Sequence, residues 1–258
     1  MPSDKKKNLE GKVAWITGGG SGIGLAAGIE LARAGVHVVL SGRSAQTLKQ
    51  AEKEVKAAGS GEAIALDVAR HGDVAKAAEK ILKRSGRIDI LVNSAGINLP
   101  KRNFSNVSIE GWNEIVAINL SGMFYCCHAV LPAMRSAKDG VIINVSSWFG
   151  RYTNSLGGPG YNATKRAVIA LTETLNMEEA RNGIRASSIL PGEVATPILE
   201  KRPVPPPQEE RARMLQAEDL GRTVAFIASF PARVCVNEVI ISPTWNRFLL
   251  GGLEPRKG

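Results

Sequence analysis

Cysteine and histidine are scarce in this sequence, and their scarcity limits the chemistry that the chain can support. Only three of the 258 residues are cysteines, and two of them, Cys126 and Cys127, are adjacent, so no disulfide framework is indicated. The three histidines lie far apart and no Cys-x-x-Cys pair occurs, so we expect no metal site. This use of thiols is typical of a reducing compartment, and we expect a cytoplasmic protein.

Long apolar segments and clustered charge are also missing. We find no uninterrupted apolar stretch of the roughly 20 residues that cross a bilayer, and the first ten residues, MPSDKKKNLE, lack the apolar part of a signal peptide. The net charge is +9, but the basic residues are scattered, without a basic stripe interleaved with aromatic residues. We therefore expect no membrane and no nucleic acid as partners, and a solvated surface with one site for an anionic ligand.

The chain does contain a regular alternation of short apolar runs and helical stretches. Runs rich in Val and Ile, without polar alternation, predict strands buried on both faces at 13–17, 36–41, 63–66, 88–93, 141–146, 185–190 and 238–241. Helical periodicity lies between them, at 23–34, 45–58, 74–84, 110–133, 161–181 and 218–229. This alternation predicts an α/β fold, a doubly wound Rossmann-type three-layer sandwich with a mainly parallel sheet of about seven strands.

One segment interrupts the alternation. Residues from about 198 to 217 carry prolines at 203, 205, 206 and 207 beside many charges, without any sign of a second core. We predict a single domain over 1–258 in which this segment is a lid-like insertion, with mobile ends at 1–8 and 251–258. The tail holds Trp245, Phe248, Leu249 and Leu250, a cluster that would pack on a neighbouring subunit or close a pocket.

A glycine-rich turn, Thr17-Gly-Gly-Gly-Ser-Gly-Ile-Gly24, lies between the first predicted strand and the first predicted helix. Glycines permit a tight turn and let the backbone approach a pyrophosphate, and the helix N-terminus offers free N–H groups to that anion. A glycine turn without a ligand is the alternative, but the position directly after a buried strand favours a dinucleotide site.

A second motif, Tyr161-Asn-Ala-Thr-Lys165, places Tyr161 and Lys165 on one face of a predicted helix. Alone, the pair could equally be a surface Tyr and a surface Lys. Together with the spacing Gly18-x-x-x-Gly22-x-Gly24, however, it resembles the short-chain dehydrogenase/reductase family, in its short single-domain branch. The resemblance extends from about residue 9 to residue 241 and implies the Rossmann-type fold as well as a nicotinamide cofactor.

The resemblance implies four catalytic residues, which are Asn119, Ser147, Tyr161 and Lys165. Tyr161 would be the general acid or base, and Lys165 would lower its pKa and bind the nicotinamide ribose. Ser147 would hydrogen-bond the substrate oxygen, and Asn119 would hold a water that links Lys165 to solvent. Ser147 lies 14 residues before Tyr161, where the family often has 13, so Ser146 is the alternative. Trp148 would line the substrate pocket together with Ser147 and Tyr161.

The resemblance also implies a set of residues at strand ends that bind the cofactor: Gly18, Ser21, Gly22, Ile23, Gly24, Arg43, Asp67, Val68, Asn93, Ala95, Gly96, Tyr161, Lys165, Pro191, Gly192, Val194 and Thr196. Asp67 would contact the adenine amino group, although a turn or cap residue is the alternative. NAD enzymes of the family commonly have an acidic residue at the position of Gly42, whereas Arg43 here is placed to meet a 2′-phosphate, with added hydrogen bonds from Ser41 or Ser44. We favour NADP(H), with NAD(H) as the alternative.

The implied function is an NADP(H)-preferring oxidoreductase that interconverts a ketone or aldehyde, including 3-oxoacyl types, and an alcohol by hydride transfer. A non-catalytic nucleotide-binding protein on the same scaffold is the alternative. Trp148, Phe149 and Tyr152 favour an apolar or ring-bearing small-molecule substrate, or are loop packing. Three basic residues, Arg151, Lys201 and Arg202, either meet an acidic substrate group or are solvated. The resemblance implies a homotetramer or homodimer, formed through the helices that carry Asn119 and Tyr161.

Overall fold

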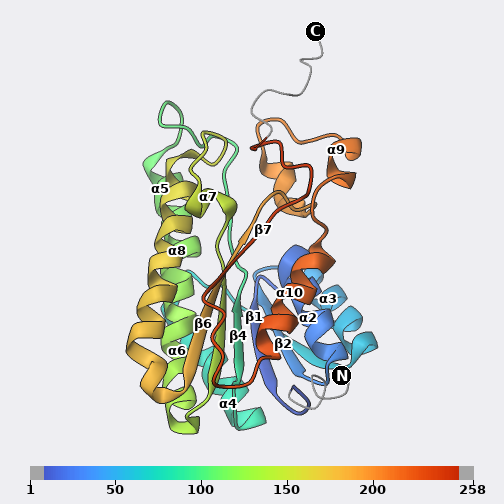
Figure 1. Cartoon of the computed structure of the whole chain (residues 1–258), viewed down its shortest axis with the longest axis vertical. Coiled ribbons are helices and arrows are strands. Elements are labelled where there is room, and N and C mark those ends of the chain that lie inside the picture. The colour runs from blue at the N-terminus through green and yellow to red at the C-terminus, as the bar shows by residue number, and fades with distance from the viewer. Residues whose placement is uncertain (1–8, 250–258) are drawn as a thin grey trace.

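The sheet organises this computed structural model, which describes residues 9–249 (Figure 1). Its seven strands, all parallel, follow the order β3-β2-β1-β4-β5-β6-β7. They are β1 (Val13–Thr17), β2 (His37–Gly42), β3 (Ser60–Ala65), β4 (Ile90–Asn93), β5 (Gly140–Val145), β6 (Ile184–Pro191) and β7 (Glu238–Ile241). The order reverses between β1 and β4, and ligands of open α/β sheets bind beside such a reversal, at the carboxyl ends of the strands.

Helices cover both faces of the sheet. One face carries α2 (Gly22–Arg33), α3 (Ala45–Ala58) and α10 (Ala217–Ala228), and the other carries α4 (His71–Ser85), α6 (Gly122–Ala137) and α8 (Gly158–Glu179). Successive strand residues alternate between the two cores, as Ala14 and Ile16 pack under α2 whereas Val13 and Trp15 pack under α4 and α6. The predicted α/β fold, doubly wound with a mainly parallel sheet in three layers, is therefore confirmed.

Several element boundaries differ from the prediction by one to three residues, and one predicted helix is divided. The third strand begins at residue 60 and not at 63, because the polar residues Ser60–Glu62 pair in register with β2. The predicted helix at 110–133 is α5 (Ile109–Val116), a π-helical turn (Ala117–Ser121) and α6. This continuous run is long and apolar enough to cross a membrane by length and composition alone. Half of its apolar window is buried in the fold, and Met123, Cys127 and Val130 belong to the core, as in a core helix.

The remaining short elements gather near the carboxyl end of the sheet (Figure 1). They are α7 (Trp148–Arg151), the 3-10 turn at Pro197–Lys201 and α9 (Gln208–Ala212), while a further 3-10 turn, Ala180–Asn182, follows α8. The segment predicted as a lid therefore has helical turns of its own, and Leu215 returns to pair with Val194. The predicted mobile ends, and Leu250 of the tail, lie outside the described residues.

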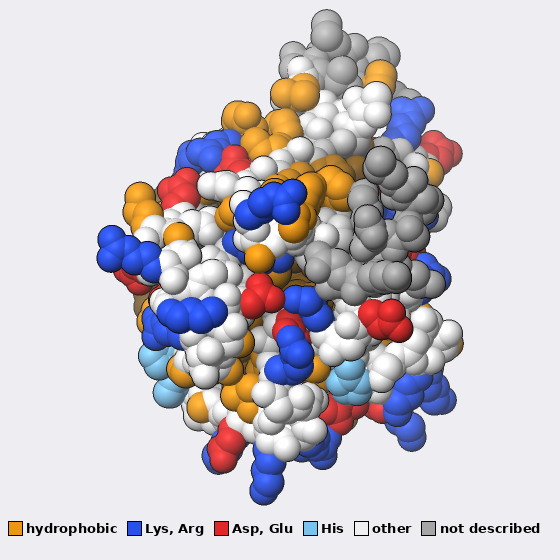
Figure 2. All heavy atoms as spheres, turned by 60° about the horizontal axis from the view of Figure 1, so that its bottom comes forward, with side chains coloured by type: hydrophobic (Ala, Val, Ile, Leu, Met, Phe, Trp, Pro, Cys, Tyr) orange, Lys and Arg blue, Asp and Glu red, His pale blue; other side chains and the backbone are white. Residues whose placement is uncertain are grey.

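The surface shows no concentration of positive charge on the face in view. In Figure 2, Lys and Arg side chains are spread over this face, with Asp and Glu side chains among them. Several basic residues are ion-paired, as Lys56 is with Glu52 and Arg84 with Glu62. This distribution agrees with a solvated surface.

Candidate active site

Two cavities lie along the carboxyl edge of the sheet and meet at Gly18, Ala95 and Gly96. The larger, of about 280 Å³, extends from the glycine turn to Tyr161 and Lys165. The smaller, of about 130 Å³, lies on the other side of Gly18. Because they share these three residues, we describe them as two ends of one elongated site, a tyrosine end and a ribose end.

Most of the predicted site residues line one of these cavities. The tyrosine end is lined by Gly18, Ser21, Gly22, Ile23, Ala95, Gly96, Ser147, Trp148, Tyr161, Lys165, Pro191, Gly192, Val194 and Thr196. The ribose end is lined by Gly18, Arg43, Asp67, Val68, Ala95 and Gly96. Three predicted residues, Gly24, Asn93 and Asn119, line neither cavity. Each contacts or precedes a segment that carries lining residues.

The glycine turn is built so that its backbone faces the cavity. Gly18 and Gly22 have positive φ angles, +67° and +54°, which L side chains rarely adopt. A Cβ on Gly24 would lie 2.4 Å from the carbonyl oxygen of Gly18, so only glycine lets α2 begin directly under the turn. Ser21, which precedes α2, makes no side-chain cap, and the first N–H groups of the helix remain available to an anion. This cradle fits the pyrophosphate of a dinucleotide.

At the ribose end, one of the three polar side chains predicted to favour a 2′-phosphate lines the cavity. Arg43 lies there with an exposed side chain. Ser41, in contrast, is fully buried and accepts a hydrogen bond from the indole N–H of Trp15, and Ser44 caps α3 by accepting from the Thr47 N–H. Asp67 also lines this end, and its carboxylate accepts from the Ala69 N–H, so it is a turn residue as well.

Asn93, predicted as a cofactor residue, is turned into the protein. Its amide donates to Asn144 Oδ1 over 2.9 Å, and Asn144 in turn donates to Thr172 Oγ1 over 2.9 Å. All three side chains are buried, and these hydrogen bonds join β4, β5 and α8. Asn93 therefore fixes the strand end that precedes Ala95 and Gly96, and its cofactor-binding role stays a prediction.

Asn119 lies in the π-helical turn and is fully buried. Its side-chain oxygen accepts from the Ile97 N–H over 2.8 Å, and its amide donates to the Ile97 carbonyl over 3.0 Å. A Cβ on Gly96 would lie 3.5 Å from Asn119 Oδ1 and 3.4 Å from Lys165 Nζ. Asn119 thus holds the loop after β4 and lies close to the Lys165 ammonium, as a relay residue would.

Lys165 is buried directly behind Tyr161. Its ammonium donates to the Val145 carbonyl over 2.8 Å and lies 5.6 Å from the centre of the Tyr161 ring. Burial lowers the pKa of Lys165 to about 8. Burial also raises the pKa of Tyr161 above its usual value, against the lowering effects of the hydrogen bond with Ser147 and the charges of Arg202 and Arg102. Without a cofactor, the Tyr161 phenol therefore holds its proton firmly.

The structure separates the two candidate serines. Ser146 donates to the Lys165 carbonyl over 2.6 Å, so its hydroxyl fastens β5 to α8. Ser147 precedes α7, accepts from the Phe149 N–H over 3.1 Å and is hydrogen-bonded with Tyr161. The geometry brings Ser147 and Tyr161 together, in spite of the 14-residue spacing.

Two arginines complete the tyrosine end, and sequence reasoning identified one of them. Arg202, named above as either a substrate contact or a solvated charge, lines the cavity and pairs with the buried Glu193 over 2.7 Å. Arg102 was missed because no motif surrounds it, yet it lines the same end and is 5% exposed. Arg151 does not line the cavity and is paired with Glu238.

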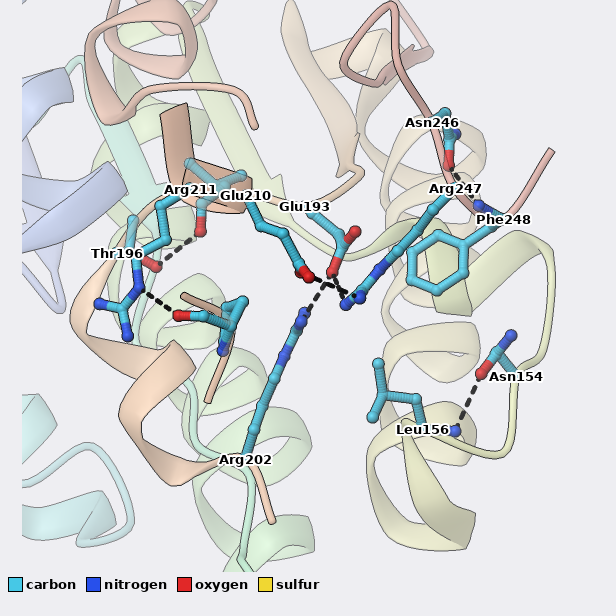
Figure 3. A network of polar contacts seen from close by, with 12 residues as sticks. Asn154, Leu156, Glu193, Thr196, Arg202, Glu210, Arg211, Asn246, Arg247 and Phe248 are labelled. Atoms are coloured by element: carbon cyan, nitrogen blue, oxygen red, sulfur yellow. Dashed lines mark hydrogen bonds and ion pairs between the residues drawn. The ribbon is translucent and has the colours of Figure 1, made fainter. Parts of the chain in front are cut away.

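The C-terminal tail closes this end of the cavity. Phe248 lines it and packs edge-to-face on Phe149, with ring centres 5.1 Å apart. Arg247 reaches Glu193 over 2.6 Å, and Figure 3 shows the side chains of Arg202 and Arg247 converging on this carboxylate. Tyr152, predicted to line the pocket, packs on Trp148 outside it and is 51% exposed. Of the two predicted roles of the tail, pocket closure is the one visible in a single chain.

A glycine cradle in one cavity with Tyr161 and the buried Lys165, at the switch point of a doubly wound sheet, defines a nicotinamide-dependent oxidoreductase. The family model described as short chain dehydrogenase matches residues 12–205. The chain is 33% identical over 238 residues to the 3-oxoacyl-(acyl-carrier-protein) reductase of Thermotoga maritima, which covers 90% of this chain and 96% of the relative. The chain therefore belongs to the short-chain dehydrogenase family, and it is an NAD(P)-dependent dehydrogenase or reductase.

Solved structures agree. A metagenomic short-chain oxidoreductase in complex with NADP superposes with a TM-score of 0.80 at 30% identity, covering 92% of this chain and 99% of that one. The 3-ketoacyl-(acyl-carrier-protein) reductase of Brucella melitensis, complexed with NADH, gives a TM-score of 0.82 at 31% identity and covers 91% and 98%. These complexes support a nicotinamide cofactor of either type.

Proposed function

We propose that this enzyme reduces a ketone or aldehyde to an alcohol, or runs the reverse reaction, with Tyr161 as the general acid or base. The observation that carries the proposal is the position of the Tyr161 phenol. It lies in one cavity with the glycine cradle, and it is hydrogen-bonded with Ser147 and backed by Lys165. A bound nicotinamide cofactor would supply or accept the hydride.

The side chains around Tyr161 suit proton donation to a carbonyl oxygen. Because burial raises its pKa, the phenol is protonated at neutral pH and can donate as negative charge develops on the substrate oxygen. The Ser147 hydroxyl would donate a second hydrogen bond to the same oxygen. The Tyr161 phenolate would then take up a proton from solvent, through Lys165 and a water held by Asn119. The reverse reaction needs the phenolate, so its rate would rise with pH.

The cofactor preference that we propose is NADP(H). Arg43 lies at the rim of the ribose end, and Gly42 leaves that strand end without a carboxylate for a ribose 2′-hydroxyl. A guanidinium in this place suits a 2′-phosphate. The relatives and solved neighbours named as 3-oxoacyl or 3-ketoacyl reductases make such carbonyl compounds one candidate substrate type.

We also propose a homodimer or homotetramer in the cytoplasm, assembled through α5, α6 and α8. Large apolar side chains are exposed on these helices, including Trp112, Phe124 and Met177, the last with 83% of its surface exposed. Apolar surface of this kind is typical of interfaces. Light scattering on the purified protein measures the assembly directly, and a monomer would contradict it.

The test of the catalytic proposal is turnover, followed by absorbance at 340 nm, over ketones, aldehydes and alcohols. Tyr161→Phe removes the proton donor and keeps the ring, so we expect turnover to fall by about 10³-fold while the cofactor dissociation constant stays within about twofold. Tyr152→Phe is the matched control, because Tyr152 lies outside the cavity, and it keeps full activity. Retention of a tenth of the activity by Tyr161→Phe refutes the assignment.

A further inference from the structure

We propose that the substrate carries a carboxylate that binds Arg102, so that the enzyme acts on short oxo acids and the corresponding hydroxy acids. This inference rests on the proposed carbonyl–alcohol function and names its substrate class. It is carried by a buried guanidinium that lines the tyrosine end and has no carboxylate partner among the described residues.

Arg102 has fewer partners than its burial demands. Its two terminal nitrogens donate to the backbone carbonyls of Leu156 and Lys201, and its buried Nε–H finds no acceptor within residues 9–249. An isolated charge in the interior is costly unless it is paired, and carbonyl oxygens supply only dipoles. Burial and the nearby charge of Arg202 lower the pKa of Arg102, as expected for a cation that lacks a counterion.

The neighbouring charges leave room for one more anion. Glu193 is shared by Arg202 and Arg247, since both guanidinium groups contact its Oε1 atom. Arg247 also reaches Glu210 over 3.4 Å (Figure 3). Among the described residues, these three guanidinium groups therefore have two carboxylate partners, and Arg102 is the one without an ion pair. A carboxylate with a single negative charge would balance it, whereas a phosphate would bring nearly two.

The position of Arg102 relative to Tyr161 sets the length of the substrate. Arg102, Arg202 and Tyr161 line the same cavity of about 280 Å³, and the charges of both arginines lower the pKa of the Tyr161 phenol. Apolar side chains also line this end, among them Trp148, Leu156 and Phe248. A substrate whose carbonyl oxygen meets Tyr161 while its carboxylate meets Arg102 has only a short chain between the two. A guanidinium fork matches carboxylate geometry better than an ammonium does.

The test compares pairs of substrates that differ in one charge. We would measure kcat/KM with NADPH for 2-oxobutanoate, 3-oxobutanoate and 4-oxopentanoate, each beside its methyl ester. We expect at least one acid to exceed its ester by about 100-fold. Arg102→Gln removes the charge and keeps an amide donor for the backbone, and it lowers kcat/KM for that acid by about 100-fold, mainly through KM, while the ester is unaffected.

Arg151→Gln is the matched control, because Arg151 is on the adjacent α7 but its guanidinium is paired with Glu238 outside the cavity. It should change neither acid nor ester. Arg102→Lys keeps the charge without the fork and should restore part of the acid preference, which also covers the case in which Arg102→Gln does not fold. Equal rates for every acid and its ester in the parent, or a parallel loss for both in Arg102→Gln, overturn the proposal.

A binding measurement separates this proposal from the catalytic one. Calorimetry of the NADPH-loaded protein with succinate should give a dissociation constant that weakens at least tenfold in Arg102→Gln, while NADPH affinity is unchanged. Turnover that needs Tyr161 but ignores substrate charge refutes the carboxylate site and leaves the carbonyl chemistry intact. Succinate binding that needs Arg102, in a protein whose turnover does not need Tyr161, refutes the chemistry and leaves the site. Absence of succinate binding in the parent counts against the site.

Discussion

The glycine cradle and the arginine-lined region beside Tyr161 are built in different ways. The cradle consists of backbone: a glycine turn, the start of α2 and the strand ends at Gly96 and Gly192. A Cβ on Gly18 or Gly24 would lie 2.7 Å or 2.4 Å from a backbone atom. The region beside Tyr161 contains long side chains from three distant segments: Arg102 and Arg202 line the cavity, and Arg247 pairs with Glu193 next to Arg202. A backbone site recognises a group that every cofactor of this class carries, whereas a site made of side chains can change its preference by single substitutions.

The largest loss of function is expected for a substitution in the glycine cradle, and its absence would contradict this comparison. In Gly24→Ala the new methyl group would lie 2.4 Å from the Gly18 carbonyl oxygen, so the turn or the helix start must move. We expect NADPH affinity, measured by calorimetry, to fall by at least about 100-fold, and turnover of every substrate to fall with it. Gly72→Ala is the control, since nothing lies within 4 Å of its added methyl group. A Gly24→Ala protein with normal NADPH affinity would show that the cradle tolerates side chains after all.

The same difference explains what the sequence could predict. The cradle and the Tyr–Lys pair lie within eight and five consecutive residues, so their spacing carries the geometry, and Gly18, Gly22 and Lys165 were found from it. Arg102 contacts the Lys201 carbonyl 99 positions away, and Arg247 reaches Glu193 across 54 positions. No local pattern encodes such contacts, because they depend on how the insertion and the tail fold over the sheet.

The side chains of two predicted site residues point into the protein for a related reason. Asn93 and Ser41 lie at the correct strand ends, but alternate residues of a strand face opposite sides of a sheet. Asn93 accordingly reaches Asn144, and Ser41 reaches Trp15. The choice between a cofactor contact and a buried support therefore depends on a side-chain direction that the motif does not contain.

The second prediction concerns the ammonium group of Lys165, which is buried beside Tyr161. The glycine turn at 17–24, in contrast, contains no charged residue. The pKa of Lys165 is lowered from 10.5 to about 8 by burial. Between these pH values the unfolded chain binds the proton and the folded protein does not, so the free energy of unfolding rises with pH across this window. The expected gain is up to about 3 kcal/mol for the cofactor-free protein, and below pH 8 this contribution is constant.

The measurement is urea unfolding of the parent and of Lys165→Met from pH 7.5 to 10.5, with the difference between the two proteins plotted against pH. The difference is needed because the pKa of the buried Cys127 thiol, raised to about 12, makes a contribution of opposite sign that both proteins share. Lys165→Met should be the more stable protein at pH 7.5, and its advantage should vanish toward pH 10.5. A difference that does not vary with pH would mean that Lys165 stays charged in the folded protein.

The smallest effect is expected at the ribose end, where a single exposed side chain supplements the backbone. Arg43→Ala should weaken NADPH binding by about tenfold, roughly 1.4 kcal/mol, and leave NADH binding unchanged, because the guanidinium would contact only the 2′-phosphate. The loss should shrink at high salt, since Arg43 is exposed and its charge is screened. Arg33→Ala, which removes an exposed arginine paired with Glu30, is the control. If Arg43→Ala weakened the binding of NADPH and of NADH equally, Arg43 would stabilise the turn after β2 and would not contact the 2′-phosphate. Any cofactor preference at the ribose end would then come from the backbone.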